Sequence, residues 1–157
     1  MQAKLEHFSH PNIIKKKFCQ TASKIAQGIP QRASRDQLLD VAPAIPHIVE
    51  AATYLQDWLH DTDLVVPYTG LGWFYYSQGA YERAESWLLK GYSVSQKRLG
   101  EEHLDVAASL DNLSTIYWNK GRYSEAELFC QRAIKIRRKL LDDNHLDIAQ
   151  SLNTLGI

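Results

Sequence analysis

Residues 79–85 read Gly-Ala-Tyr-Glu-Arg-Ala-Glu, and residues 121–127 repeat the pattern as Gly-Arg-Tyr-Ser-Glu-Ala-Glu. The two copies begin 42 residues apart, and residues 63–104 align with residues 105–146 without a gap at eleven identical positions. Self-similarity at a fixed period is typical of repeat proteins, whose units bury their apolar faces against one another. The pattern therefore predicts a repeat fold and directs attention to surface recognition rather than to catalysis.

Each unit is predicted to form two helices joined by a turn. In the second unit apolar residues recur at helical spacing, and Gly121 ends that helix because glycine tolerates a positive φ. The stripe consists of Val106, Leu110, Leu113 and Tyr117. A third copy begins at Asp147 and stops at Ile157. The repeats are therefore residues 63–104, residues 105–146 and a truncated first helix at residues 147–157.

Single residues within the units carry further expectations. Small residues recur at positions 84 and 126 and at positions 91 and 133, where we expect two helices to approach closely. Gly70-Leu-Gly72 is assigned to helix packing, since it lacks the third glycine of a dinucleotide motif. We expect the glutamates of the repeated phrase, Glu85 and Glu127, to be exposed. Helix-capping carboxylates are predicted before three helices, at Asp63, Asp105 and Asp147.

The first 62 residues do not follow the period. Residues 1–33 are predicted to hold one short amphipathic helix, over residues 12–27, with a buried stripe of Ile14, Phe18, Ala22 and Ile25. Residues 34–62 are interpreted as a degenerate helical pair that covers the N-terminal face of the first repeat. Ser34 and Gln37 form a possible capping box for its first helix. Its second helix is predicted to start near Pro46 and to end at His60.

Composition excludes several classes of protein. Eighteen basic and eighteen acidic side chains cancel, which gives no reason to expect nucleic acid or an anionic membrane as a partner. Cys19 and Cys130 have no metal-ligand spacing, and a reduced compartment is the simpler interpretation. No apolar run is long enough for a signal peptide or membrane span. We therefore expect a soluble, cytoplasmic protein.

The repeated positions resemble the tetratricopeptide repeat (TPR) family. Both units supply its large, small and aromatic positions, with Ser114 and Cys130 as departures. The 42-residue period and the stretch from Leu99 to Ala107 are similar to the kinesin light chain subclass, with Leu104 in place of a proline. The resemblance implies an all-α, right-handed α-solenoid with two full TPR units and one truncated unit. N-terminal helices would pack on the first unit.

The resemblance also implies a function. TPR arrays hold a protein or peptide on a concave face, which here makes the chain a scaffold or adaptor and not an enzyme. Carried over position by position, the expected partner-binding residues are Thr69, Trp73, Tyr76, Asp111, Thr115, Trp118, Asn119 and Asn153. The alternative for the aromatic side chains is that they pack on the adjacent N-terminal helices or flank the core. The truncated last unit further predicts self-association, fraying or a longer array.

Other kinds of site are disfavoured. The family's clamp for terminal carboxylates needs Lys, Asn and Arg at positions where this chain has Thr69 and Trp73, then Asp111 and Thr115. His103 and His145 lie one unit apart and are assigned to loop packing, so no metal, cofactor or catalytic residue is predicted. A second functional class stays open: residues 39–63 look like the region before TPR arrays in bacterial NTPase proteins. The chain would then be a regulatory or sensor fragment of such a system.

Overall fold

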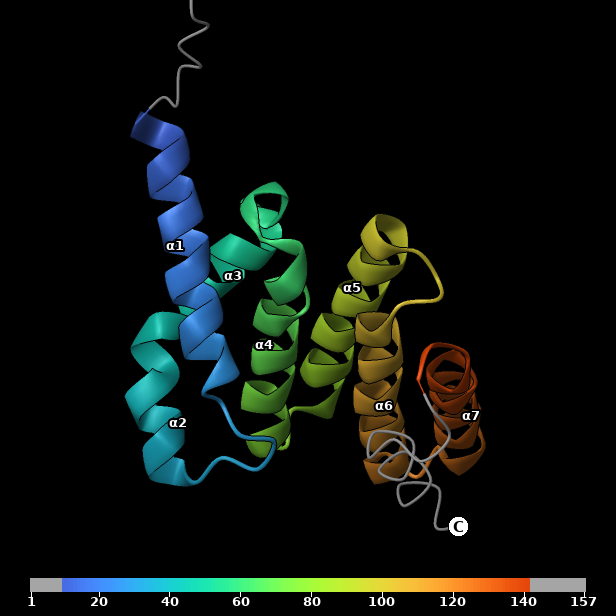
Figure 1. The fold of residues 1–157 in the computed structure, drawn as a ribbon. Coiled ribbons are helices and arrows are strands. Elements are labelled where there is room, and N and C mark those ends of the chain that lie inside the picture. Colours follow the sequence, from blue (N-terminus) through green and yellow to red (C-terminus); the bar gives the residue numbers. More distant parts are fainter. Residues whose placement is uncertain (1–9, 142–157) are drawn as a thin grey trace, which may run out of the picture.

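The structure, a computed structural model, describes residues 10–141, and its fold is all-α as predicted (Figure 1). This part of the chain forms seven α-helices. They are α1 (His10–Gln27), α2 (Arg35–Val41), α3 (Ile45–Thr53), α4 (Val66–Ser77), α5 (Tyr81–Leu99), α6 (Leu104–Asn119) and α7 (Tyr123–Leu140). Three short 3-10 turns, η1 (Ala42–Ala44), η2 (Gln56–Trp58) and η3 (Asp61–Asp63), join the early helices.

The two repeat units form antiparallel hairpins, α4 with α5 and α6 with α7 (Figure 1). Their turns have the same geometry, since Gly79 has a φ of 73° and Gly121 a φ of 74°. After each glycine the next backbone N–H bonds back to a tyrosine carbonyl: Ala80 to Tyr75 at 3.0 Å and Arg122 to Tyr117 at 2.9 Å. The repeated phrase therefore forms the same turn between helices in both units, as expected from the glycine in each copy.

The starts of the helices differ from the prediction. Asp105 does not cap α6; the cap is His103, whose Nδ1 accepts the Asp105 backbone N–H at 3.2 Å. Likewise Asp63 ends the turn η3, which begins after His60, and the His60 ring accepts the Thr62 N–H at 3.3 Å. A histidine lone pair satisfies the same orphan donor that a carboxylate would. Asp147 lies outside the described residues.

The small residues bring the helices of the core together. Ala84, Ala126 and Ala133 are buried, as is Gly91. A Cβ added to Gly91 would lie 2.7 Å from the Tyr68 Cβ, so only glycine permits this approach between α5 and α4. The Tyr68 hydroxyl donates to the carbonyl of Ala52 at 2.6 Å, and burial raises its pKa to about 12.

Two N-terminal helices, α1 and α3, cover α4 (Figure 1). The capping box of Ser34 and Gln37 is formed, yet the short helix α2 that it starts has no buried residue. The contact with α4 therefore comes from α1 and α3, and α2 lies outside this layer. The tightest point is Gly70, where an added Cβ would lie 2.7 Å from both the Cβ and the carbonyl oxygen of Ala26.

Two details of this layer were predicted wrongly. Of the expected stripe, Ala22 is buried and Phe18 is half-buried against the core, but Ile14 and Ile25 are exposed; Cys19 and Ala26 are buried in their place. Small residues face α4 because Gly70 lets the two backbones meet closely, which leaves no room for isoleucine. Helix α3 ends at Thr53 and not at His60; the turn η2 follows it, and Leu59 still reaches the core from irregular backbone.

Candidate partner-binding surface

The predicted binding residues divide between two helices and differ in exposure. On α4, Thr69 is half-buried, whereas Trp73 and Tyr76 each keep only 8% of their surface exposed. On α6, the predicted set runs from half-buried to exposed along the helix: Asp111, Thr115, Trp118 and Asn119. Asn153 lies outside the described residues. The surface is therefore open mainly at the C-terminal end of α6.

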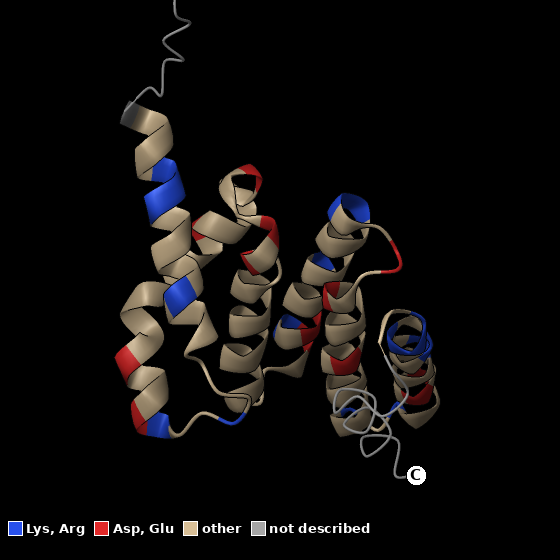
Figure 2. Ribbon diagram, viewed as in Figure 1, with Lys and Arg blue, Asp and Glu red and all other residues tan. Residues whose placement is uncertain are grey.

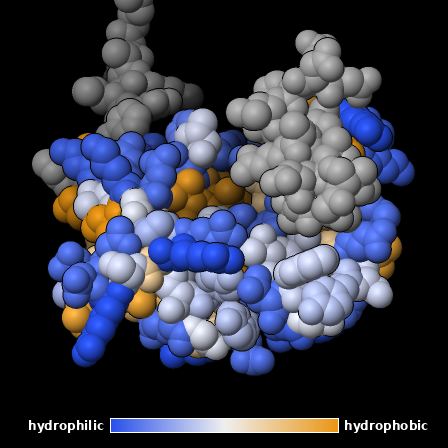
Figure 3. All heavy atoms as spheres, turned by 90° about the horizontal axis from the view of Figure 1, so that it is seen from below, coloured by the Kyte–Doolittle hydropathy of each residue, from blue (hydrophilic) through white to orange (hydrophobic). Residues whose placement is uncertain are grey.

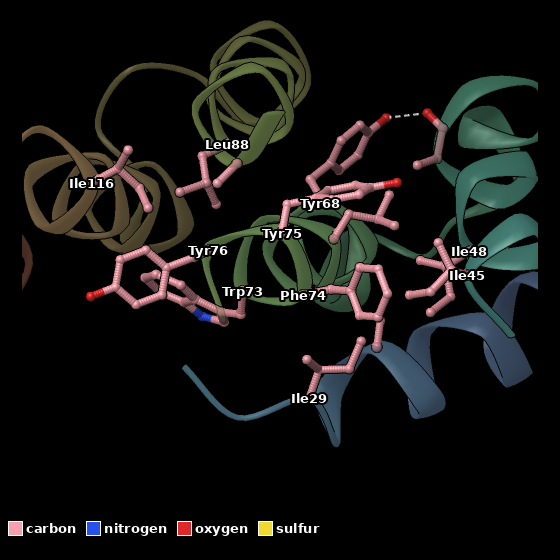
Figure 4. Close-up of a cluster of buried hydrophobic side chains, with 14 of the residues drawn as sticks. Ile29, Ile45, Ile48, Tyr68, Trp73, Phe74, Tyr75, Tyr76, Leu88 and Ile116 are labelled. Carbon is pink, nitrogen blue, oxygen red and sulfur yellow. Dashed lines mark hydrogen bonds between the residues drawn. The ribbon is translucent and has the colours of Figure 1, made fainter. Parts of the chain in front are cut away.

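Trp73 and Tyr76 belong to the core cluster in this structure. Their ring centroids lie 5.7 Å apart in an edge-to-face arrangement, and Tyr76 also contacts Tyr81 at 5.6 Å. Figure 4 shows both rings on the same side of α4. Both rings are therefore part of the core, where edge-to-face packing leaves them little freedom to reorient.

Trp118 repeats this arrangement one unit later, but in solvent. Its ring lies 4.8 Å from that of Tyr123, at the positions that Tyr76 and Tyr81 occupy in the first unit. Trp118 is 54% exposed and Tyr123 is 56% exposed. The sequence analysis missed Tyr123 as a surface residue, although it is the tyrosine of the repeated phrase. In the first unit, Tyr76 is buried in the same cluster as Ile116 of the second unit and Tyr81 packs against that cluster, a difference that sequence alone does not reveal.

Polar side chains extend from this aromatic pair along α6. The Asn119 amide donates to the Thr115 carbonyl at 2.7 Å, and the Thr115 hydroxyl donates to the Asp111 carbonyl at 3.2 Å. Asp111 forms an ion pair with the buried Arg137 of α7. Asn112, which the sequence analysis did not select, lies 3.5 Å from the Thr69 hydroxyl and links α6 to α4. This row of polar side chains along α6 therefore presents amide and hydroxyl groups, because Arg137 compensates the negative charge of Asp111.

Charged side chains tie the two units together beside this surface. Glu85 is not solvated as predicted: its carboxylate bonds to Lys120 at 2.5 Å and lies 3.4 Å from Arg122. Burial alone would raise the pKa of Glu85, but the hydrogen bonds from Lys120 and Tyr117 outweigh it and lower the pKa. Glu127, its counterpart in the second unit, is exposed as predicted. The difference arises because Glu85 faces a following unit within the described chain.

Seen from below, the surface is mostly hydrophilic; one group of hydrophobic residues lies in a central recess, and smaller hydrophobic areas lie toward the edges (Figure 3). Among residues 10–141, no three His, Cys, Asp or Glu side chains gather as metal ligands would. No helix in that same range is both long and apolar enough to cross a membrane.

A comparison with curated proteins found no match. A family model described as tetratricopeptide repeat matches residues 63–139. Among solved structures, the chain is similar to BtubC (BKLC) from P. vanneervenii, with a TM-score of 0.69 and 19% identity over 98% of this chain and 58% of that one.

The chain is also similar to a candidate kinesin light chain of Podosopora anserina with nearly identical TPR-like repeats. A variant of that protein with one substitution gives a TM-score of 0.65 and 20% identity over 96% of this chain and 66% of that one. A second structure of these repeats gives a TM-score of 0.65 and 19% identity over 94% of this chain and 66% of that one. At such identities the likeness shows the fold, and this chain spans less than two thirds of the length of these proteins.

Proposed function

Because residues 63–139 of this chain belong to the tetratricopeptide repeat family, we propose that it is a non-enzymatic scaffold that binds a protein or peptide. The contact surface is the concave face, centred on the C-terminal half of α6. Tetratricopeptide repeats serve in general as protein-interaction modules, so the coarse assignment follows from the fold.

The observation that carries the proposal is the exposed aromatic pair of Trp118 and Tyr123. Large aromatic side chains are enriched at binding hot spots, where they supply contact area at a low cost in conformational entropy. Asn119 adjoins the pair and offers amide groups to a peptide backbone. Trp73 and Tyr76 support the surface from within, so their role differs from the direct contact expected from sequence.

The partner that fits is an extended segment or a helix with an apolar side chain for the ring pair. The hydrogen-bonding row of Thr69, Thr115 and Asn119 would align its polar groups. Self-association is a second occupant, because another copy of the chain would also cover Trp118 and Tyr123. The two occupants differ in whether the surface stays accessible at high protein concentration.

The test is selection of peptides from a random display library on the immobilised chain. Trp118→Ala is expected to reduce binding of the selected peptides at least about tenfold, while the helical circular dichroism is unchanged. Tyr54→Ala is the matched control, since Tyr54 is an exposed aromatic residue at the end of α3. Peptides that bind both variants as tightly as the parent chain would refute the assignment of the surface.

Light scattering at rising concentration separates the second occupant. A dimer that Trp118→Ala abolishes would identify the ring pair as a self-association surface and would contradict the peptide proposal. A regulatory role within an NTPase system, suggested by residues 39–63, stays a prediction. Finding a nucleotide-binding domain encoded beside this chain would favour it.

A further inference from the structure

A polar cleft lies between α1 and the start of α4, away from the exposed aromatic pair. Its volume is about 540 Å³, and its walls include Lys17, Gln20, Ser23 and Lys24 of α1, with Asp63 and Val66 opposite. The helices meet at Ala26 and Gly70, toward the C-terminal end of α1. The cleft occupies the space that remains between them nearer the other end.

One wall of this region is held firmly in place. The guanidinium of Arg98, on α5, donates to the carbonyl of Gln56 at 3.2 Å and to that of Leu59 at 2.9 Å, and its Nε lies 2.7 Å from the Asp61 carboxylate. These contacts fix the segment that leads into Asp63. The Arg98 and Asp61 charges compensate each other, whereas the Asp63 carboxylate has, among the residues that the structure describes, only a long contact of 3.4 Å with the Thr62 hydroxyl.

Ser23 points to a missing partner. It is 4% exposed and lines the cleft, and within the described chain its Oγ has no hydrogen-bond partner. A buried hydroxyl without a partner costs about 1–3 kcal/mol, and nearly all such groups in native proteins are satisfied. A polar group entering the cleft would satisfy it.

The charges of the cleft restrict what that group can belong to. Lys17 and Lys24 lie two helical turns apart on the same face of α1, and among residues 10–141 neither forms an ion pair. Basic residues on α1 can be followed in Figure 2. A purely cationic ligand would meet the two ammonium groups, and a purely anionic ligand would meet the Asp63 carboxylate. Two cations and one anion are matched by a ligand with two carboxylates and one ammonium group.

We propose that this cleft binds a small acidic zwitterion of that kind, such as an acidic amino acid. Its two carboxylates lie against Lys17 and Lys24, and one carboxylate accepts a hydrogen bond from the Ser23 hydroxyl. Its ammonium group faces Asp63. Charge-assisted hydrogen bonds of this sort are about twice as strong as neutral ones, which allows a ligand with little apolar surface to bind. The site is separate from the proposed peptide surface, so either can fail without the other.

The experiment is a titration of the full chain with L-glutamate, followed by amide chemical shifts. Saturable shifts are expected in residues 17–27 and 60–66. Glutarate has the same two carboxylates and lacks the ammonium group, and it should bind about tenfold or more weakly. No saturable shift in those residues, or equal binding of glutarate, would overturn the proposal.

Three variants sharpen the test. Lys17→Met combined with Lys24→Met is expected to abolish the shifts, whereas Lys90→Met, at an exposed position of α5 that does not line the cleft, should leave them unchanged. Ser23→Ala should weaken glutamate binding, yet leave the ligand-free chain as stable as before or more so, because it removes an unsatisfied hydroxyl. If Lys90→Met weakens binding as much as the double variant, or if Ser23→Ala destabilises the free chain, the cleft is an ordinary hydrated crevice.

Discussion

Gly70 and Gly72 both lie on α4 with a single residue between them, yet an added methyl group would meet a different obstacle at each. At Gly70 it would meet the backbone of Ala26, with the nearest atoms at 2.7 Å. At Gly72 it would meet the side chain of Leu88 at 2.6 Å, which can move to another rotamer. Backbone of a neighbouring helix has no such freedom, so the glycines differ in how well they tolerate substitution.

We predict that Gly70→Ala lowers the free energy of unfolding by about 1–3 kcal/mol, because overpacking outweighs the gain in helix propensity. Gly72→Ala should stay within about 1 kcal/mol of the parent chain, since Leu88 can yield. Urea denaturation followed by circular dichroism measures both. Equal losses would mean that the α1 layer shifts as readily as a side chain does.

Glu85 and Glu127 have the same place in the repeated phrase and opposite surroundings. The lowered pKa of Glu85 means that its stabilising effect is present above its ordinary value of 4.5 and is lost as the pH falls through the folded-state pKa. We predict that Glu85→Gln costs about 1–3 kcal/mol at pH 7 and much less at pH 3. Glu127, which accepts a hydrogen bond from Gln131 at 2.9 Å, supplies the control.

Stability curves of both variants across this pH range check the prediction. Glu127→Gln should follow the parent chain at every pH because its carboxylate is exposed. A Glu85→Gln variant that loses the same stability at pH 3 as at pH 7 would show that shape, and not charge, holds the units together there.

At the scale of the element, α6 depends on a cap that propensity tables rank low. His103 closes its first turn with a ring nitrogen, where Ser, Thr, Asp and Asn are the usual residues. A sequence search for caps therefore selects the neighbouring carboxylate at Asp105. That carboxylate lies 3.7 Å from the His103 Nδ1, and burial raises its pKa, with the nearby His103 acting in the opposite direction.

We predict that His103→Ala costs about 0.5–2 kcal/mol, whereas His103→Asn retains most of the stability because asparagine is a good cap. Thermal denaturation and amide exchange of the first turn of α6 measure the effect. An asparagine variant as unstable as the alanine variant would assign the effect of His103 to packing in the loop.

Helix α1 shows that the spacing of apolar residues can predict a helix without predicting which of its faces is buried. The expected stripe is confirmed at Ala22 and, in part, at Phe18, but its two isoleucines are exposed and Cys19 and Ala26 are buried instead. The existence and span of the helix follow from the sequence. Which face it buries depends on Gly70, far along the chain, because only a small-residue face fits against that glycine.

At the scale of the whole molecule, the repeat could be predicted from sequence, but the burial of equivalent residues in its two copies could not. Gly79, Gly121 and the alanines of the phrase act through local backbone geometry, so their roles could be read from spacing. Trp73, Tyr76 and Glu85 depend on whether another unit stands beside them. Sequence assigns equivalent residues the same role, while the structure buries Tyr76, half-buries Tyr81 and Glu85, and exposes their counterparts Trp118, Tyr123 and Glu127.

The N-terminal layer is expected to stabilise the first unit as strongly as the second unit does. Helix α4 is buried along most of its length, with α1 and α3 on one side and α5 on the other. We predict that removing residues 1–33 lowers the melting temperature by about 10 °C or more and opens α4 to amide exchange. Leu39→Ala, in the exposed helix α2, should leave both unchanged.

The contact between Ala26 and Gly70 also determines at which end of the repeat array new units can be added in protein engineering. Extra units are commonly added to repeat scaffolds by copying one hairpin onto either end. Ahead of Asp63, a grafted hairpin would have to displace a helix whose backbone already touches α4. Redesign that retains α1 as a fixed starting piece and varies the surface of α6 and α7 therefore keeps this close backbone contact intact.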